Sequence, residues 1–179
     1  MSPIAAGHLL IIAKSHKNNF YSDLIDHSSE IRKIIRLFRA FCARDLSSLA
    51  IAFEHGIATA ADEENRSSCI DHAHVHLLPI GTHLSGAMIM KGEGVSDLES
   101  KFSQMISQYY FLSDTYSIDF LSASEIFGSQ FFRKSIALMM SLPFWHWLDV
   151  YLLDENNRSR YLQTENILKS FSAYLSENI

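Results

Sequence analysis

Residues 71–79 read DHAHVHLLP, so that histidines alternate with small or aliphatic residues before an apolar run. Side chains on a strand point alternately to its two faces, and a strand here would place the three histidines on one face. The residues between them would pack on the other face, and their β-branched and aliphatic types also favour a strand. A helix would scatter the histidines around its axis. The stretch therefore predicts a strand with two different faces. His72, His74 and His76 form a polar face suited to chemistry, and Ala73, Val75 and Leu77 form the face that packs in the core.

The composition indicates one domain, residues 1–179. A chain of 179 residues and 20.4 kDa with 47% hydrophobic residues can bury one good core but is short for two. The formal net charge of -5 and the pI near 6.0 argue against a general binder of nucleic acid or acidic membranes, since polyanion binding needs a basic surface. A single phosphate is still compatible, because backbone amides can hold it locally.

The cysteines and the N-terminal residues bear on the cellular compartment. Cys42 and Cys69 are far apart and lack metal-type spacing, so we expect no disulfide framework and a cytoplasmic protein. Residues 1–16, MSPIAAGHLLIIAKSH, lack a basic region before the apolar run, which His8 and Lys14 interrupt. We therefore expect neither a signal peptide nor a membrane span.

The N-terminal third predicts a strand, a helix and a second strand. His8–Lys14 is short, aliphatic and bounded by Gly7 and Ser15. From Ser28 to Asp45 apolar residues recur at steps of three and four, and charged residues, Arg32 among them, fill the polar positions. Leu49–Glu54 predicts a strand that Gly56 stops, and residues 57–68 have the composition of an exposed loop.

The remainder predicts a mixture of helices and strands. Residues 81–94 are glycine-rich and irregular, and the capping-box pattern of Ser96–Glu99 predicts a helix towards Gln108. Further elements are a hairpin of Tyr109–Leu112 with Ser117–Leu121, and helices at Ser129–Ser141 and Gln163–Leu175. Strand and helix do not alternate regularly, which favours an α+β fold.

Four explanations of the alternating histidines remain open from the residues alone. They are polar residues on a solvated strand face, metal ligands, a nucleophilic histidine between two assisting ones, or a phosphate binder without turnover. Alternate strand residues lie about 6.6 Å apart, so His72 and His76 would be about 13 Å apart at the backbone. All three therefore do not meet one ion at bonds of about 2 Å, although two of them with a distant carboxylate would.

The pattern His72-Ala73-His74-Val75-His76-Leu77-Leu78 resembles the signature of the histidine triad superfamily of nucleotide hydrolases and transferases. Residues 3–16 (PIAAGHLLIIAKSH) and 53–56 (FEHG) are similar to stretches that precede the triad in that superfamily. Residues 124–137 are similar to the hairpin-then-helix tail of bacterial members. The resemblance covers about four-fifths of the chain in the expected order.

The resemblance implies an antiparallel sheet flanked by helices in one histidine-triad-like domain. Its core would span about residues 1–112, and a hairpin and helical tail would span about 113–179. Members of the superfamily carry a strand or hairpin before the stretch that begins at Pro3, with an acidic residue that holds the ribose hydroxyls. We expect this N-terminal element to be missing from the sequence given.

The resemblance also implies roles for the three histidines. His74 would attack the α-phosphorus of a nucleotide and form a nucleotidyl-histidine that water later hydrolyses. Imidazole suits this step, because it is a neutral nucleophile near pH 7 and a good leaving group as a phosphoramidate. His76 would contact the phosphate oxygens or the leaving group, and His72 would join the hydrogen-bond network that orients the site.

Five further residues are candidates for substrate binding. Glu54 occupies the place of an amide that contacts phosphate in many members, where a carboxylate would repel phosphate; it is also suited to orienting a histidine. Ser68 and Cys69 lie on the approach to the triad, and Cys69 is a better small filler than a second nucleophile. Gln130 and Arg133 are candidates because arginine grips phosphate bidentately, and the alternative for Arg133 is a solvated helix residue.

The sequence thus leads to three hypotheses about function. The first is an enzyme that hydrolyses phosphoanhydride or phosphoramidate bonds of a small-molecule nucleotide, or transfers the nucleotidyl group, through His74 and without a metal or other cofactor. The second is a degenerate, non-catalytic nucleotide- or phosphate-binding protein, and the third is a histidine metal site. A homodimer is implied by the resemblance alone. His8, His16 and His55 match superfamily positions, but a lone histidine near a strand end is more often a structural hydrogen-bonding residue.

Overall fold

The computed structural model describes residues 3–17, 19–26, 28–57, 73–80, 108–113, 118–122, 131–142 and 155–179. Five strands and four helices lie within these ranges. The strands are β1 (Leu9–Ile12), β2 (Leu49–Ile57), β3 (His74–Ile80), β4 (Gln108–Ser113) and β5 (Ile118–Ser122). The helices are α1 (Tyr21–Ile25), α2 (Glu30–Asp45), α5 (Phe131–Met139) and α7 (Glu155–Asn178). The predicted α+β class is confirmed.

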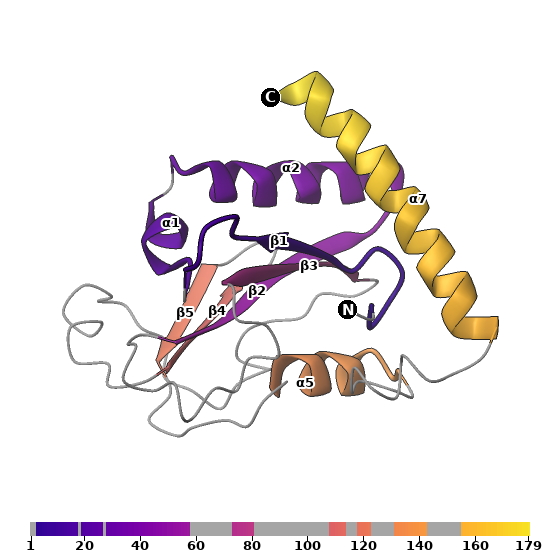
Figure 1. The fold of residues 1–179 in the computed structure, drawn as a ribbon. Coiled ribbons are helices and arrows are strands. Elements are labelled where there is room, and N and C mark those ends of the chain that lie inside the picture. Colours follow the sequence, from indigo (N-terminus) through magenta and orange to yellow (C-terminus); the bar gives the residue numbers. More distant parts are fainter. Residues whose placement is uncertain are drawn as a thin grey trace.

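The five described strands form a single sheet in the order β1-β3-β2-β4-β5. Every neighbouring pair is antiparallel, as the sequence led us to expect. Figure 1 shows α2 and α7 on one side of this sheet and α5 on the other. The strand that carries the histidines, β3, lies between β1 and β2 and is hydrogen-bonded on both sides.

The two faces of β3 differ as the alternating pattern predicts. Val75 and Leu77 are buried in the cluster that packs beneath α2, and we call this side of the sheet the α2 face. His76 and Leu78 are also buried, but Leu78 packs in the second cluster, with residues of α5. We call this opposite side, which carries His74 and His76, the histidine face.

Helix α2 covers the α2 face and begins where a capping residue satisfies its first turn. The Ser29 hydroxyl accepts a hydrogen bond from the backbone N–H of Arg32 at 3.3 Å. The apolar side chains of the helix that repeat at three- and four-residue steps are buried, and each isoleucine or phenylalanine among them contributes about 1.5–3 kcal/mol. They are Ile31, Ile35, Phe38, Phe41 and Cys42. The predicted scaffold helix is confirmed.

Arg32 departs from this prediction. The sequence places it among the polar positions, yet it is 4% exposed. Helix α1, which the apolar pattern did not reveal, packs against α2, and the Ser29 hydroxyl donates a hydrogen bond to the Asp23 carbonyl at this junction. Burial lowers the pKa of the Arg32 guanidinium, and the neighbouring charge of Arg36 lowers it further.

Helix α7 crosses the end of α2 and extends beyond it (Figure 1). Its buried contacts lie in its second half, where Phe171 packs edge-on against Phe38 with ring centroids 5.1 Å apart. Tyr174 packs against Phe41 at 5.8 Å, and the Arg44 guanidinium lies 4.4 Å from the centre of the Tyr174 ring. The sequence predicted only Gln163–Leu175, because the first part of the helix is polar and carries no apolar stripe.

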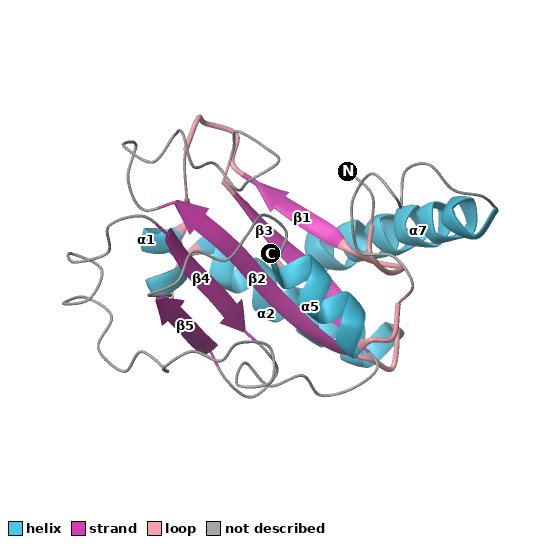
Figure 2. Ribbon diagram, turned by 90° about the horizontal axis from the view of Figure 1, so that it is seen from below, coloured by secondary structure: helices cyan, strands magenta, loops and turns pink. Residues whose placement is uncertain are grey.

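On the histidine face, α5 packs across β2 and β3, as the view from below shows (Figure 2). Phe132, Ile136 and Ala137 of this helix pack against Phe53 of β2 and Leu78 of β3. The predicted helix at 129–141 is thereby confirmed within its described residues. Its burial of apolar surface holds the helix close to the histidines.

Several boundaries differ from prediction or lie outside the described residues. Strand β2 does not stop at Gly56, because β4 continues the ladder and pairs Gly56 with Tyr109 and Ile57 with Gln108. The hairpin of β4 and β5 is confirmed. The expected irregular segments and the helix after Ser96 fall on residues that the structure does not describe, apart from their ends Ile57 and Gln108, which belong to strands.

The described cysteine, Cys42, is a buried free thiol, and burial raises its pKa to about 12. Within the described ranges, every helix is too short or too polar to cross a membrane.

Candidate active site

His74 and His76 lie side by side on the histidine face of β3. Their ring centroids are 4.9 Å apart and the rings are inclined by 65°. His74 is partly buried, whereas His76 is 7% exposed. The third histidine of the alternating series, His72, lies outside the described residues. The structure thus brings two of the three predicted histidines together.

A further histidine, His8, joins this pair from the chain just before β1. Leu10 of β1 pairs directly with His76 in the antiparallel register, and His8 lies two residues earlier, on the same side of the chain. His8 Nε2 lies 2.8 Å from His76 Nδ1, and both side chains are buried. The rings stack with their centroids 5.1 Å apart. His8 is therefore the direct hydrogen-bond partner of His76.

The hydrogen bonds around His8 determine which ring nitrogens carry protons. The backbone N–H of Ile4 donates to His8 Nδ1 at 3.1 Å, so this nitrogen accepts. A neutral His8 then carries its proton on Nε2 and donates it to His76 Nδ1. Neutral His76 in turn carries its proton on Nε2, which is the nitrogen that His8 does not engage. The chain of bonds thus makes His76 a hydrogen-bond donor at Nε2.

Both buried histidines are held in the neutral form. Burial is the largest cause that lowers the pKa of His8 well below its ordinary value, followed by the positive charge of Arg133 and by His74. For His76, burial again comes first, and the neighbours His8, His74 and Arg133 lower its pKa further. A protonated imidazole would add a positive charge to that of Arg133 in an apolar surrounding, which is unfavourable, so both rings carry the protons of the neutral form.

Phe53 fixes the plane of the His76 ring. The two rings are parallel within 5°, with centroids 4.4 Å apart. Phe53 pairs with His76 across β2 and β3, and Phe132 of α5 packs on Phe53 at 5.3 Å. The sequence by itself gives no sign that Phe53 belongs to the site. Its role follows from strand register, which the sequence does not reveal.

Arg133 lies buried on the histidine face, at 5% exposure, and not in solvent. The solvated alternative for this residue is therefore wrong. Its neighbour Phe132 packs on Phe53, which stacks on His76, and its charge acts on both His8 and His76. Arg133 shares its helix face with Ile136 and Ala137, which pack on the histidine side of the sheet. Gln130, the other candidate near this helix, lies outside the described residues.

Glu54 belongs to the opposite face of the sheet. Phe53 points to the histidine face, so the next residue of the strand points to the α2 face. The carboxylate accepts hydrogen bonds from the backbone N–H of Phe20, at 3.1 and 3.4 Å to its two oxygens, and is 1% exposed. Glu54 thus lies on the side of the sheet opposite His74 and His76, which disfavours the predicted contact with substrate beside them; the role of orienting a histidine stays a prediction. Its carboxylate satisfies the buried backbone N–H of Phe20 at the start of α1.

The other predicted site residues, Ser68 and Cys69, also lie outside the described residues. His16 is described and exposed, in the chain after β1. Among the residues that the structure describes, no three histidine, cysteine or acidic side chains come together in a way that would hold a metal ion.

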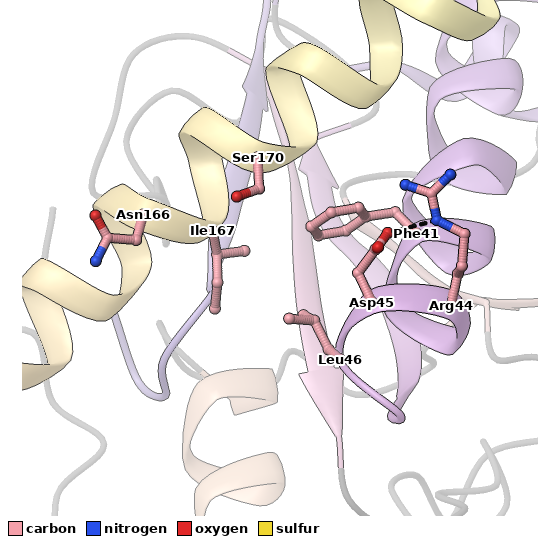
Figure 3. A pocket seen from close by; sticks show the side chains of 7 residues that line it. All are labelled: Phe41, Arg44, Asp45, Leu46, Asn166, Ile167 and Ser170. Atoms are coloured by element: carbon pink, nitrogen blue, oxygen red, sulfur yellow. Dashed lines mark hydrogen bonds and ion pairs between the residues drawn. The ribbon is translucent and has the colours of Figure 1, made fainter.

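A depression between α2 and α7 is lined by residues of both helices and of the turn after α2 (Figure 3). Its lining residues are Phe41, Arg44, Asp45, Leu46, Asn166, Ile167 and Ser170. Phe41 and Ile167 pack in the cluster beneath α2. The depression is therefore on the α2 face, on the side of the sheet opposite His74 and His76.

Comparisons with known proteins identify no relative of this chain: no family model, no curated protein and no solved structure matches it.

Proposed function

We propose that this protein acts on a nucleotide at its α-phosphate, through a covalent nucleotidyl-histidine on His74. The observation that carries the proposal is the arrangement around His76. That ring is buried, neutral and fixed by His8 and Phe53, and it lies beside the more accessible ring of His74. One imidazole is thus accessible as a nucleophile, and its neighbour is held as a hydrogen-bond donor.

The proposed first step forms one bond and breaks one. The lone pair of a His74 ring nitrogen attacks phosphorus, and the bond from phosphorus to the leaving group breaks with its electron pair on the leaving group. In the second step a water oxygen attacks the same phosphorus, the N–P bond breaks, and its electron pair returns to His74. The proton that water loses passes to solvent. Transfer in place of hydrolysis needs another nucleophile where water attacks.

His76 supports this chemistry through a hydrogen-bond donor, its Nε2–H, because the contacts with His8 and Phe53 hold the ring in one orientation. Its Nε2–H is available because Nδ1 accepts from His8. A fixed N–H aimed at an oxygen that gains negative charge lowers the barrier, because it needs no reorganisation during reaction. We therefore assign His76 to the phosphate oxygens or the leaving group. The same two roles follow from the resemblance to the histidine triad superfamily, which also gives His72 an orienting role.

Trapping of the covalent intermediate tests the proposal. The protein is incubated with diadenosine triphosphate or with adenosine phosphoramidate, each labelled at the α-phosphate, and quenched in base. We expect label that stays on the wild-type protein, is released by acid and is absent from His74→Ala. His16→Ala is the matched control, because His16 is exposed and outside the His8–His76 pair.

The same experiment separates the alternatives. Label that survives in His74→Ala would overturn the assignment of the nucleophile. Saturable nucleotide binding with neither label nor product would instead support a binding protein without turnover. Stoichiometric zinc together with activity that a chelator abolishes would support a histidine metal site.

A further inference from the structure

Arg133 is a buried cation within the candidate site. It lies on α5 among residues that pack against the sheet, and its side chain is 5% exposed. The next residue along the helix, Lys134, is exposed. The helix therefore turns one of two adjacent cations towards the histidine face and the other towards solvent.

Packing of α5 fixes which side of the sheet Arg133 faces, because Ile136 and Ala137 lie three and four residues further along the helix on the same face. Phe132 packs on Phe53 at 5.3 Å, and Phe53 stacks on His76 at 4.4 Å. Ile136 and Ala137, one turn further along α5, are fully buried against the same face. Helix α5, which carries Arg133, is thereby held on the histidine side of the sheet (Figure 2). The electrostatic effect of its charge on both His8 and His76 agrees with this placement.

Two kinds of leaving group place opposite demands on such a site. An amine that departs from phosphorus must receive a proton as the P–N bond breaks, which calls for a protonated acid. A phosphate that departs from a phosphoanhydride keeps the electron pair of the P–O bond as negative charge and needs no proton, but gains from a nearby cation. Neutral His76 offers a hydrogen bond, and Arg133 offers a permanent charge in fork geometry that fits phosphate.

We propose that Arg133 binds the leaving group and makes the site selective for leaving groups that depart as phosphate anions over those that depart as amines. This inference rests on the proposed function. His74 attacks the α-phosphorus, the bridging P–O bond breaks with its electron pair on the departing phosphate, and Arg133 stabilises the charge that develops there. The phosphoanhydride is then the substrate class, and the phosphoramidate is a poor one.

Substitutions at Arg133, measured on two substrates with the same nucleoside, test this selectivity. Diadenosine triphosphate releases ADP, and adenosine phosphoramidate releases ammonia. We expect wild type to prefer the triphosphate in kcat/KM. Arg133→Met should lower kcat/KM for the triphosphate by about 10²–10³-fold, the usual effect of removing one transition-state donor. The kcat/KM for the phosphoramidate should change by less than about fivefold, so the preference of the enzyme for the triphosphate becomes smaller.

Three controls make the outcomes decisive. Lys134→Met removes the exposed neighbouring cation and should leave both substrates unchanged. Arg133→Lys keeps the charge but loses the fork, and should recover part of the triphosphate activity. Thermal unfolding of each variant shows whether the fold is kept, and the Lys variant carries the test if Arg133→Met does not fold.

Equal losses on both substrates, or a wild-type preference for the phosphoramidate, would overturn the selectivity assigned to Arg133 while His74 labelling stood. The absence of labelling from either substrate would overturn the proposed function itself. The two failures are therefore distinguishable.

Discussion

His8 Nε2 lies 2.8 Å from His76 Nδ1, and this contact joins two residues that are 68 positions apart in the sequence. The backbone N–H of Ile4 fixes the His8 tautomer from one side, and His8 fixes the His76 tautomer from the other. The segment before β1 thus determines which nitrogen of His76 donates a hydrogen bond. This relationship connects the stability of the N-terminal segment to the chemistry proposed for His74.

The substitution His8→Phe should weaken both stability and activity. Phenylalanine keeps a ring of similar size beside Phe53 but leaves the buried His76 Nδ1 without its donor and the Ile4 N–H without its acceptor. A buried polar group that loses its partner costs about 1–3 kcal/mol. Chemical denaturation should show this loss, whereas Lys14→Ala at an exposed position should change the free energy of unfolding by less than about 0.5 kcal/mol. Equal stability of the two variants would contradict the hydrogen-bond role of His8.

The free energy of unfolding should fall as the pH drops from about 7 to about 5. Burial lowers the pKa of both His8 and His76 in the folded protein, so below about pH 6.5 the unfolded chain binds protons that the folded protein does not. The contribution of these two neutral histidines to the free energy of unfolding is complete above about pH 6.5. It is lost as the pH falls towards their lowered pKa values in the folded protein. The slope is about 1.4 kcal/mol per pH unit for each histidine.

Denaturation curves at a series of pH values measure this slope. The double variant His8→Phe/His76→Phe removes both titrating rings, so its stability should depend much less on pH across the same range. A wild-type slope in the double variant would mean that other groups are responsible.

Substitutions of Glu54 should affect folding and not substrate recognition. Glu54→Ala leaves the buried N–H of Phe20 without its acceptor, and we expect a loss of about 1–3 kcal/mol. Glu54→Gln keeps an acceptor oxygen and should lose less. Because Glu54 points to the α2 face, KM should stay within about twofold of wild type in both folded variants. A large change in KM with unchanged stability would return Glu54 to the substrate site.

Phe171 should be the residue through which α7 stabilises the domain. It is 3% exposed and packs against Phe38 and Phe41 of α2. Phe171→Ala removes this buried ring and should destabilise the protein by about 3–5 kcal/mol. On the same helix Leu168 is 48% exposed, and Leu168→Ala should change stability by less than about 0.5 kcal/mol. Thermal and denaturant unfolding of the two variants provide the comparison, and similar stabilities would mean that α7 is not part of the cooperative fold.

The sequence predicted the elements whose side chains repeat with a clear period. Alternation identified β3 and its two faces, and steps of three and four identified α2 and its buried residues. It did not reveal α1, which has five residues and no apolar stripe, or the polar first half of α7. The sequence predicts a strand end at Gly56, but pairing with Tyr109 extends β2 through it. Such pairing is a property of two segments and cannot be read from one.

For the candidate site, the local pattern by itself determined that His74 and His76 share a face, since the alternation of a strand requires nothing beyond the chain. Only the tertiary structure decided the surroundings of that face. Strand register placed His8 and Phe53 on His76, the packing of α5 buried Arg133 beside them, and the same alternation along β2 turned Glu54 to the other side. The physical reason is that these contacts join segments far apart in the chain, and the burial of apolar surface by the whole fold selects which segments meet.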